Sequence, residues 1–233
     1  MSLTEELLDE AIITIERAEN LLIDLDGTLI DSLPCLETTY FDFLSGFGKA
    51  GSREEFAELI GPPIEEVVTI LRERYNLEQD TESLLADYHG RMDGNYSLCQ
   101  AMKGADDLLT LAGATGRRLA LVTGADAMTV TGILKRLGWS NRFDVVVTAC
   151  DSYPEHKPSP VPYLKALAGL GTTKESCLVL EDSLNGIKSA TAAGLASIAI
   201  TAGNHDALRQ AGAGHCLTSL SALVELSKRA WQA

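Results

Sequence analysis

The second half of the chain alternates short apolar runs with amphipathic stretches. Apolar runs of strand length occupy residues 118–123, 143–148, 177–180, 197–201 and, more weakly, 215–218. Apolar positions at helical spacing fill residues 105–114, 127–137, 160–170, 185–193 and 221–230. Strands that are apolar throughout and that alternate with helices are typical of a parallel sheet covered on both faces. The pattern therefore predicts an α/β fold with a doubly wound, Rossmann-like core.

The first hundred residues follow a different pattern. Residues 3–19 carry apolar side chains at helical spacing, and residues 20–25 form a short apolar run of strand character. From about residue 34 to residue 101 no strand signal is found, and amphipathic segments cover residues 36–47, 53–59, 64–75 and 82–98. We therefore expect an N-terminal helical extension (1–19), an α/β core (20–33 and 102–233) and a helical domain (34–101) inserted after the first strand.

Composition and charge narrow the class of protein. The chain has 233 residues, of which 45% are hydrophobic, and its formal net charge is −14. Such an acidic surface repels nucleic acid and anionic lipid, so we expect neither as a partner. The five cysteines are scattered without a CxxC pair, which argues against disulfides and structural zinc. No signal peptide or membrane span is evident, so we expect a cytoplasmic protein. We also expect a monomer or a weak homodimer.

Polar residues with chemical potential follow the predicted strands. Asp24 and Asp26 come at the end of the first strand, Thr123 ends another, and Glu181-Asp182 follow a third, while Lys157 lies in the segment after the strand at 143–148. The carboxyl ends of parallel strands meet at one edge of a sheet, so we expect these groups to converge. Clustered carboxylates need a cation, and oxygen ligands suit Mg²⁺. A hydroxyl and an ammonium beside them suit a phosphate group.

Read in order, these residues resemble the four motifs of the haloacid dehalogenase superfamily. The motifs are Asp24-Leu25-Asp26-Gly27-Thr28, Thr123, Lys157 and Glu181-Asp182, and the helical insertion is similar to the α-helical cap of that superfamily. The resemblance is to the branch of phosphoglycolate phosphatases and β-phosphoglucomutases. It implies a Mg²⁺-dependent phosphatase that acts on small phosphorylated metabolites, phosphoglycolate-like or sugar phosphates, through an aspartyl-phosphate intermediate.

The resemblance also implies roles for the residues of the first motif. Asp24 would be the nucleophile that accepts the phosphoryl group. Asp26 would protonate the leaving oxygen and then deprotonate the attacking water. Gly27 would let the chain turn sharply, and Thr28 would orient Asp26.

The other motifs would bind the transferring group and the metal. Thr123 would hydrogen-bond the phosphoryl group beside the Gly124 amide, and Lys157 would neutralise charge between Asp24 and the phosphate. The implied Mg²⁺ ligands are Asp24, the Asp26 carbonyl, Asp182 and Glu181, the last as a direct ligand or in contact with one. One departure from the family pattern is Ala125, which stands where a Ser or Asn often follows the Thr.

Several other activities use the same fold. Asp26 argues against a dehalogenase, and the absence of lysine between Lys49 and Lys103 argues against a phosphonatase that uses a cap lysine. A β-phosphoglucomutase-like phosphoryl transfer is disfavoured because Leu36 stands where those enzymes carry a histidine, but it stays open. A non-catalytic regulatory or binding protein is the alternative of another class, although no motif residue is lost.

The insertion is where we expect substrate selection. Residues 59–65 resemble the cap loop of phosphoglycolate-phosphatase-like members, and the Gly61-Pro62-Pro63 break lies within them. The resemblance therefore implies that Gly61 and Pro62 bind substrate.

Overall fold

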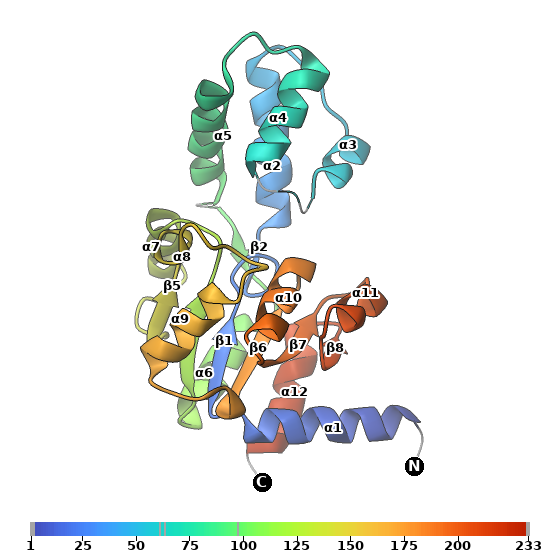
Figure 1. The fold of residues 1–233 in the computed structure, drawn as a ribbon, viewed down its shortest axis with the longest axis vertical. Coiled ribbons are helices and arrows are strands. Elements are labelled where there is room, and N and C mark those ends of the chain that lie inside the picture. Colours follow the sequence, from blue (N-terminus) through green and yellow to red (C-terminus); the bar gives the residue numbers. More distant parts are fainter. Residues whose placement is uncertain (1–2, 61, 63, 97, 232–233) are drawn as a thin grey trace. The chain divides into compact units, whose positions relative to one another are not determined.

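The computed structural model describes residues 3–60, 62, 64–96 and 98–231. The chain divides into two compact units, which we call the sheet unit (residues 1–30 and 101–233) and the helical unit (31–100). Figure 1 shows the elements of each. The predicted division into extension, core and cap stays a prediction.

The sheet unit is built on a six-stranded sheet whose order is β5-β4-β1-β6-β7-β8. Its strands are β1 (Asn20–Ile23), β4 (Arg118–Val122), β5 (Val145–Val147), β6 (Cys177–Glu181), β7 (Ala196–Ile200) and β8 (His215–Leu217). Every neighbouring pair is parallel. The prediction of a doubly wound parallel sheet is therefore confirmed. The order reverses beside β1, the position at which ligands bind beyond the carboxyl ends of such sheets.

Helices cover both faces of this sheet (Figure 1). They are α1 (Leu3–Arg17), α6 (Ala105–Ala114), α7 (Ala127–Arg136), α8 (Ala149–Ser152), α9 (Val161–Leu170), α10 (Leu184–Ala192), α11 (His205–Gln210) and α12 (Leu220–Trp231), with a 3₁₀ turn at Lys174–Ser176. On one face Leu22, Ala120 and Val179 pack against α9 and α10. On the other face α12 packs against α1 and α6, while α6 packs against β4 and α1 against β6. Alternate strand residues supply the two cores, as a period of two requires.

The N-terminal helix α1 belongs to the sheet unit. Its Ile15 is fully buried, and the indole Nε1 of Trp231 in α12 donates a hydrogen bond of 2.8 Å to the Ile15 carbonyl. The Arg117 guanidinium lies 4.4 Å from the centre of the Trp231 ring. These contacts join the first and last helices of the described chain.

The helical unit contains α2 (Leu33–Gly46), α3 (Arg53–Glu58), α4 (Ile64–Tyr75) and α5 (Thr81–Tyr96). Its own core is aromatic: Phe43 packs edge-on against Tyr88, and Leu71 and Leu84 are buried beside them. The hydroxyls of Tyr40 and Tyr75 both donate hydrogen bonds to the Glu55 carboxylate. This carboxylate also accepts a hydrogen bond of 2.7 Å from the Arg74 guanidinium. Burial raises the pKa of Glu55, but these hydrogen bonds outweigh it, so the pKa lies below its ordinary value.

Three features differ from the predicted elements. The chain leaves the sheet unit through β2 (Ile30–Asp31) and returns through β3 (Gln100–Ala101), and these strands pair in a small sheet that the sequence did not indicate. The short helices α8 and α11 were also not predicted. Finally, β1 ends at Ile23, because the Leu25 carbonyl accepts from the amides of Leu29 and Ile30 and turns the chain back. None of the helices formed by the described residues combines the length and the apolar character that a membrane-spanning helix needs.

Candidate active site

The register of the sheet brings the predicted motif residues to one edge. Ile23 in β1 pairs with Leu121 in β4 and with Leu180 in β6, so these three strands end side by side. Asp24 follows Ile23, and its amide still donates to the Leu180 carbonyl. The side chains that follow each strand therefore point into one small region of the sheet unit. Asp24, Thr123, Lys157, Glu181 and Asp182 all lie there.

Lys157 is the centre of this cluster. Its Nζ donates to Asp24 Oδ1 at 2.6 Å, to Glu181 Oε1 at 2.6 Å and to the Val122 carbonyl at 2.8 Å. An ammonium has three protons, so all of its donors are used. Burial lowers the pKa of Lys157, but the Asp24 and Glu181 carboxylates outweigh it and hold the pKa well above its ordinary value. Lys157 is therefore a fixed positive charge.

Glu181 is a buried anchor for this lysine. Its side chain is 0% exposed, and its Oε1 accepts from the Tyr163 hydroxyl at 2.9 Å as well as from Lys157. Its Oε2 accepts from the amides of Asp182 and Ser183 and from the Ser183 hydroxyl. A Cβ at Gly186 would lie 1.8 Å from the Glu181 carboxyl carbon, so the glycine leaves room for this carboxylate. A buried charge needs such compensation.

Tyr163 is the participant that sequence reasoning missed. It lies on α9, six residues after Lys157, and its side chain is fully buried. The Lys157 ammonium lies 5.2 Å from the centre of its ring. Burial, followed by the negative charge of Glu181, raises the Tyr163 pKa well above its ordinary value, so the phenol stays a proton donor. In the sequence this residue is one more aromatic on an apolar helix face, and nothing distinguishes it from a core residue.

A group of carboxylates beside Lys157 suits a divalent cation. One oxygen each from Asp24, Glu181 and Asp182 lie within 4.8 Å of one another. Burial raises the Asp24 pKa well above its ordinary value despite Lys157, because Glu181 and Asp182 add repulsion. Burial and Glu181 raise the Asp182 pKa to about 7. One ammonium does not neutralise these groups, so the donor set fits Mg²⁺.

Gly27 leaves room for the Asp182 carboxylate. Its φ is +77°, which L side chains rarely adopt, and a Cβ there would lie 2.0 Å from Asp182 Oδ2. The turn after Asp26 therefore requires glycine for two reasons, backbone conformation and the approach of a carboxylate. Thr28 beside it is fully buried, and within the described part of the chain its hydroxyl finds no hydrogen bond. Its expected role in orienting Asp26 stays a prediction.

Thr123 lies between the first motif and α7. Its hydroxyl lies 3.5 Å from Asp26 Oδ2 and accepts from the Ala125 amide at 3.0 Å. The neighbouring Gly124 is exposed, so its backbone is accessible to a ligand. Asp126 then caps α7, accepting from the amides of Met128 and Thr129.

The two residues proposed from the insertion lie in the helical unit. Pro62 is half-buried just before α4. Gly61, with Pro63, lies outside the described residues. Their role in binding substrate stays a prediction.

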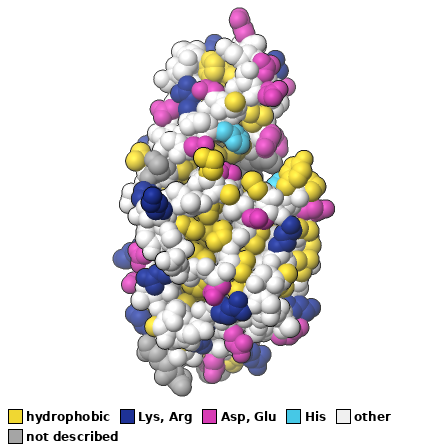
Figure 2. Space-filling model, turned by 90° about the vertical axis from the view of Figure 1, so that its left-hand side faces the viewer, with side chains coloured by type: hydrophobic (Ala, Val, Ile, Leu, Met, Phe, Trp, Pro, Cys, Tyr) yellow, Lys and Arg dark blue, Asp and Glu magenta, His cyan; other side chains and the backbone are white. Residues whose placement is uncertain are grey.

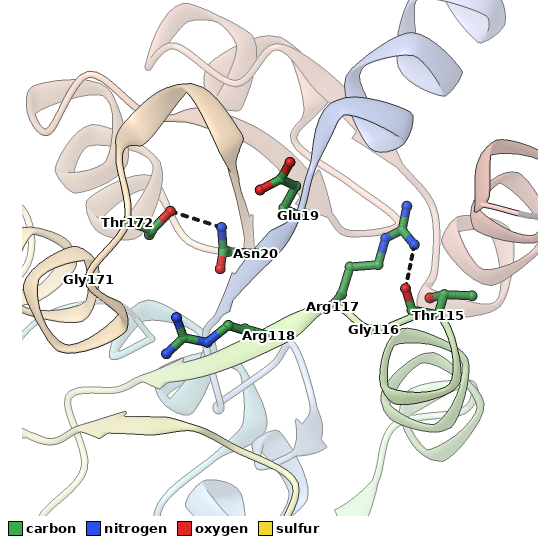
Figure 3. Close-up of a pocket in the computed structure, with 8 residues that line it drawn as sticks. All are labelled: Glu19, Asn20, Thr115, Gly116, Arg117, Arg118, Gly171 and Thr172. Atoms are coloured by element: carbon green, nitrogen blue, oxygen red, sulfur yellow. Dashed lines mark hydrogen bonds between the residues drawn. The ribbon is translucent and has the colours of Figure 1, made fainter.

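A cavity of about 340 Å³ lies at the opposite edge of the sheet, lined by Glu19, Asn20, Thr115, Gly116, Arg117, Arg118, Gly171 and Thr172. Figure 3 shows that its two arginines point in different directions. Arg117 donates to the Thr115 carbonyl at 3.0 Å and Arg118 to the Leu170 carbonyl at 2.5 Å. The described lining residues include no cluster of groups aimed at one point, and the candidate active site is the Lys157 cluster.

The chain is similar to known proteins over most of its length. Residues 21–200 match the model of the haloacid dehalogenase-like hydrolase family. A phosphoglycolate phosphatase from Colwellia psychrerythraea is 30% identical over 230 residues, covering 92% of this chain and 99% of that protein. A bifunctional riboflavin kinase/FMN phosphatase from Arabidopsis thaliana is 28% identical over 180 residues, and the chain spans only 47% of its length.

A solved structure also resembles the chain. The crystal structure of CbbY from Rhodobacter sphaeroides in complex with phosphate has a TM-score of 0.73 and 28% identity, covering 88% of this chain and 96% of that one.

Proposed function

Because the chain belongs to the haloacid dehalogenase-like hydrolase family, we propose that it is a Mg²⁺-dependent phosphatase that hydrolyses small phosphomonoesters through a phosphorylated Asp24. The observation that carries the proposal is Lys157, held by two carboxylates beside Asp182 at the carboxyl edge of the sheet. This arrangement supplies positioned positive charge, an acceptor for a phosphoryl group, and oxygen ligands for a metal. Phosphoryl transfer consists mostly of positioning and charge neutralisation.

The proposed reaction has two steps. In the first, an oxygen of Asp24 bonds to phosphorus, the bond from phosphorus to the ester oxygen breaks, and Asp26 gives its proton to the departing alcohol. In the second, water bonds to phosphorus, Asp26 takes one of its protons, and the bond to Asp24 breaks to release inorganic phosphate. Asp26 is therefore deprotonated after the first step and protonated again, as at the start, after the second.

The remaining residues bind and orient. Lys157 aligns Asp24, since it donates directly to Oδ1, and its charge opposes the rise of the Asp24 pKa that burial causes. The Thr123 hydroxyl and the Gly124 amide hydrogen-bond the phosphoryl oxygens. Glu181 and Tyr163 hold Lys157 in place.

The metal fits the same residues. Asp24, Asp182 and the Asp26 carbonyl would hold Mg²⁺, and Glu181 would do so only by releasing one of its five protein donors. When bound, Mg²⁺ supplies positive charge that offsets the negative charge of the phosphate and of the carboxylates. The named relatives act on different phosphomonoesters, so kinship alone does not select a substrate.

The test is turnover of 4-nitrophenyl phosphate with Mg²⁺ and with excess chelator. We expect chelation to abolish turnover and Mg²⁺ to restore it, and we expect Ca²⁺ to restore it poorly because its coordination is larger and looser. Asp26→Asn should lower kcat by roughly 10²–10⁴. Acid-quenched wild type should carry one phosphoryl group by mass spectrometry, and Asp24→Asn should carry none. Thermal unfolding of both variants checks that they fold. Turnover by Asp24→Asn, or in excess chelator, would contradict the proposal.

A further inference from the structure

The loops at the catalytic edge are strongly acidic. Residues 24–29, 123–126, 148–160, 182–183, 201–204 and 218–219 follow the carboxyl ends of the six strands, and all are described. Lys157 is the only lysine or arginine among them. The acidic residues of the same loops are Asp24, Asp26, Asp126, Asp151, Glu155 and Asp182. Even with one bound Mg²⁺, the positive charges at this edge do not offset its carboxylates, so no surplus positive charge is available for a further negative group on a substrate.

Lys157 has no capacity left for a second anion. Its three protons are directed to Asp24, Glu181 and the Val122 carbonyl, and its side chain is only 12% exposed. It is therefore committed to the point where the phosphoryl group is transferred. A carboxylate or a second phosphate on the leaving group would find no cation on these loops.

The helical unit is also acidic. Residues 31–100 contain 14 Asp and Glu against five Lys and Arg, a formal charge of −9. On the face drawn in Figure 2, acidic side chains are spread over this unit. Its four arginines are all held within the unit: Arg53 by Glu37, Arg72 by the Gln79 carbonyl, Arg74 by Glu55 and Arg91 by Asp87. The fifth basic residue is Lys49.

We propose that the enzyme selects phosphomonoesters whose leaving group is an uncharged alcohol, such as a polyol or a sugar, over esters whose leaving group carries a carboxylate or a second phosphate. This inference rests on the proposed phosphatase function. A negative field around a catalytic edge lowers the local concentration of anions, and each added charge on the substrate increases the repulsion. An uncharged alcohol adds none.

Two matched substrate pairs test the inference. One is 2-hydroxyethyl phosphate against 2-phosphoglycolate, and the other is 4-carbamoylphenyl phosphate against 4-carboxyphenyl phosphate. The members of each pair are similar in size and differ by one negative charge. At low salt we expect kcat/KM to favour the uncharged member about tenfold, the effect of one unit charge roughly 12 Å away at an effective dielectric constant of about 20.

Salt supplies the second readout. Raising the ionic strength from about 0.01 M to about 1 M shortens the Debye length from about 30 Å to about 3 Å. At constant Mg²⁺ the ratio within each pair should therefore fall toward one. A preference caused by shape instead of charge would persist at every salt concentration, and this would overturn the inference.

Variants that remove negative charges test whether the acidic residues of the catalytic edge cause the substrate preference. Asp126→Asn keeps a side chain that caps helices well, and Glu155 is exposed two residues before Lys157. The double variant Asp126→Asn/Glu155→Gln should raise kcat/KM for the anionic members severalfold and change the uncharged members less than twofold. The control is Glu16→Gln, which removes an exposed charge from α1.

The outcomes separate the two proposals. Equal or better turnover of the anionic members at low salt overturns the inference on specificity and leaves the phosphatase function standing. Absence of turnover for all four esters and for 4-nitrophenyl phosphate overturns the function itself. An equal response of the double variant and of the Glu16→Gln control would show that the charges at the catalytic edge are not responsible.

Discussion

Tyr163→Phe removes one hydroxyl from the centre of the site and nothing else. The phenol donates at 2.9 Å to Glu181 Oε1, and both side chains are fully buried. Phenylalanine fills the same volume apart from the oxygen, so no large cavity results. The variant therefore isolates one hydrogen bond to a buried charge.

The expected cost follows from that contact. Hydrogen bonds to charged groups contribute roughly 1.5–3 kcal/mol. Glu181 Oε1 keeps its bond to Lys157 at 2.6 Å, so the carboxylate is not left alone. For a chain of this length each kcal/mol lowers Tm by roughly 2–4 °C, and we expect a decrease of about 3–12 °C. Because Glu181 also positions Lys157, kcat should fall about 10–100-fold, the usual effect of losing a group that orients active-site residues.

The assays are thermal unfolding and steady-state kinetics with a fixed aryl phosphate. Tyr88→Phe is the matched control: Tyr88 is buried in the helical unit, and no hydrogen bond of its hydroxyl is found among the described residues. Its pKa, raised to about 12 by burial, keeps it protonated. A Tyr163→Phe protein with wild-type Tm would refute the energetic argument. A lowered Tm with unchanged kcat would make Tyr163 structural only.

Two further predictions concern local geometry and pH. Gly27→Ala should raise the Mg²⁺ concentration needed for half-maximal activity, because the new Cβ meets Asp182 Oδ2. It should also cost about 1–2 kcal/mol of backbone strain. The control is Gly138→Ala, which has a φ of +73° and nothing within 4 Å of the new Cβ, so it should show the strain alone. Equal metal titrations for the two variants would contradict the assigned contact. Glu55→Gln should lower the Tm of the protein at neutral pH, because the hydrogen bonds from Tyr40, Tyr75 and Arg74 outweigh burial and hold the Glu55 pKa below 4.5. A lowered carboxyl pKa stabilises the fold above the unfolded value and loses this contribution as pH falls through the folded value. The Tm difference from wild type should thus shrink below about pH 4, and a constant difference would show that the charge is irrelevant.

Most residues of the candidate site could be predicted from the sequence. Asp24, Thr123, Lys157 and Glu181-Asp182 were predicted to converge because each lies at or after the end of a strand, and the parallel register then places them together. Their chemical types indicated a phosphate and a metal before any geometry was known. Tyr163 could not be found this way, since a tyrosine on an apolar helix face is usually a core residue.

The sequence by itself determined the order of the six strands of the main sheet and of the longer helices, because such an element is encoded by side-chain periodicity over neighbouring residues. It also determined which polar groups end the strands. Tertiary structure decided what depends on residues far apart in the chain: the pairing of β2 with β3, the hydrogen bond from Trp231 to the Ile15 carbonyl, and the hydrogen bond from Tyr163 to the Glu181 carboxylate. Such contacts form only when the packed core fixes both partners. The periodicity of a short segment does not indicate which distant side chain will contact it.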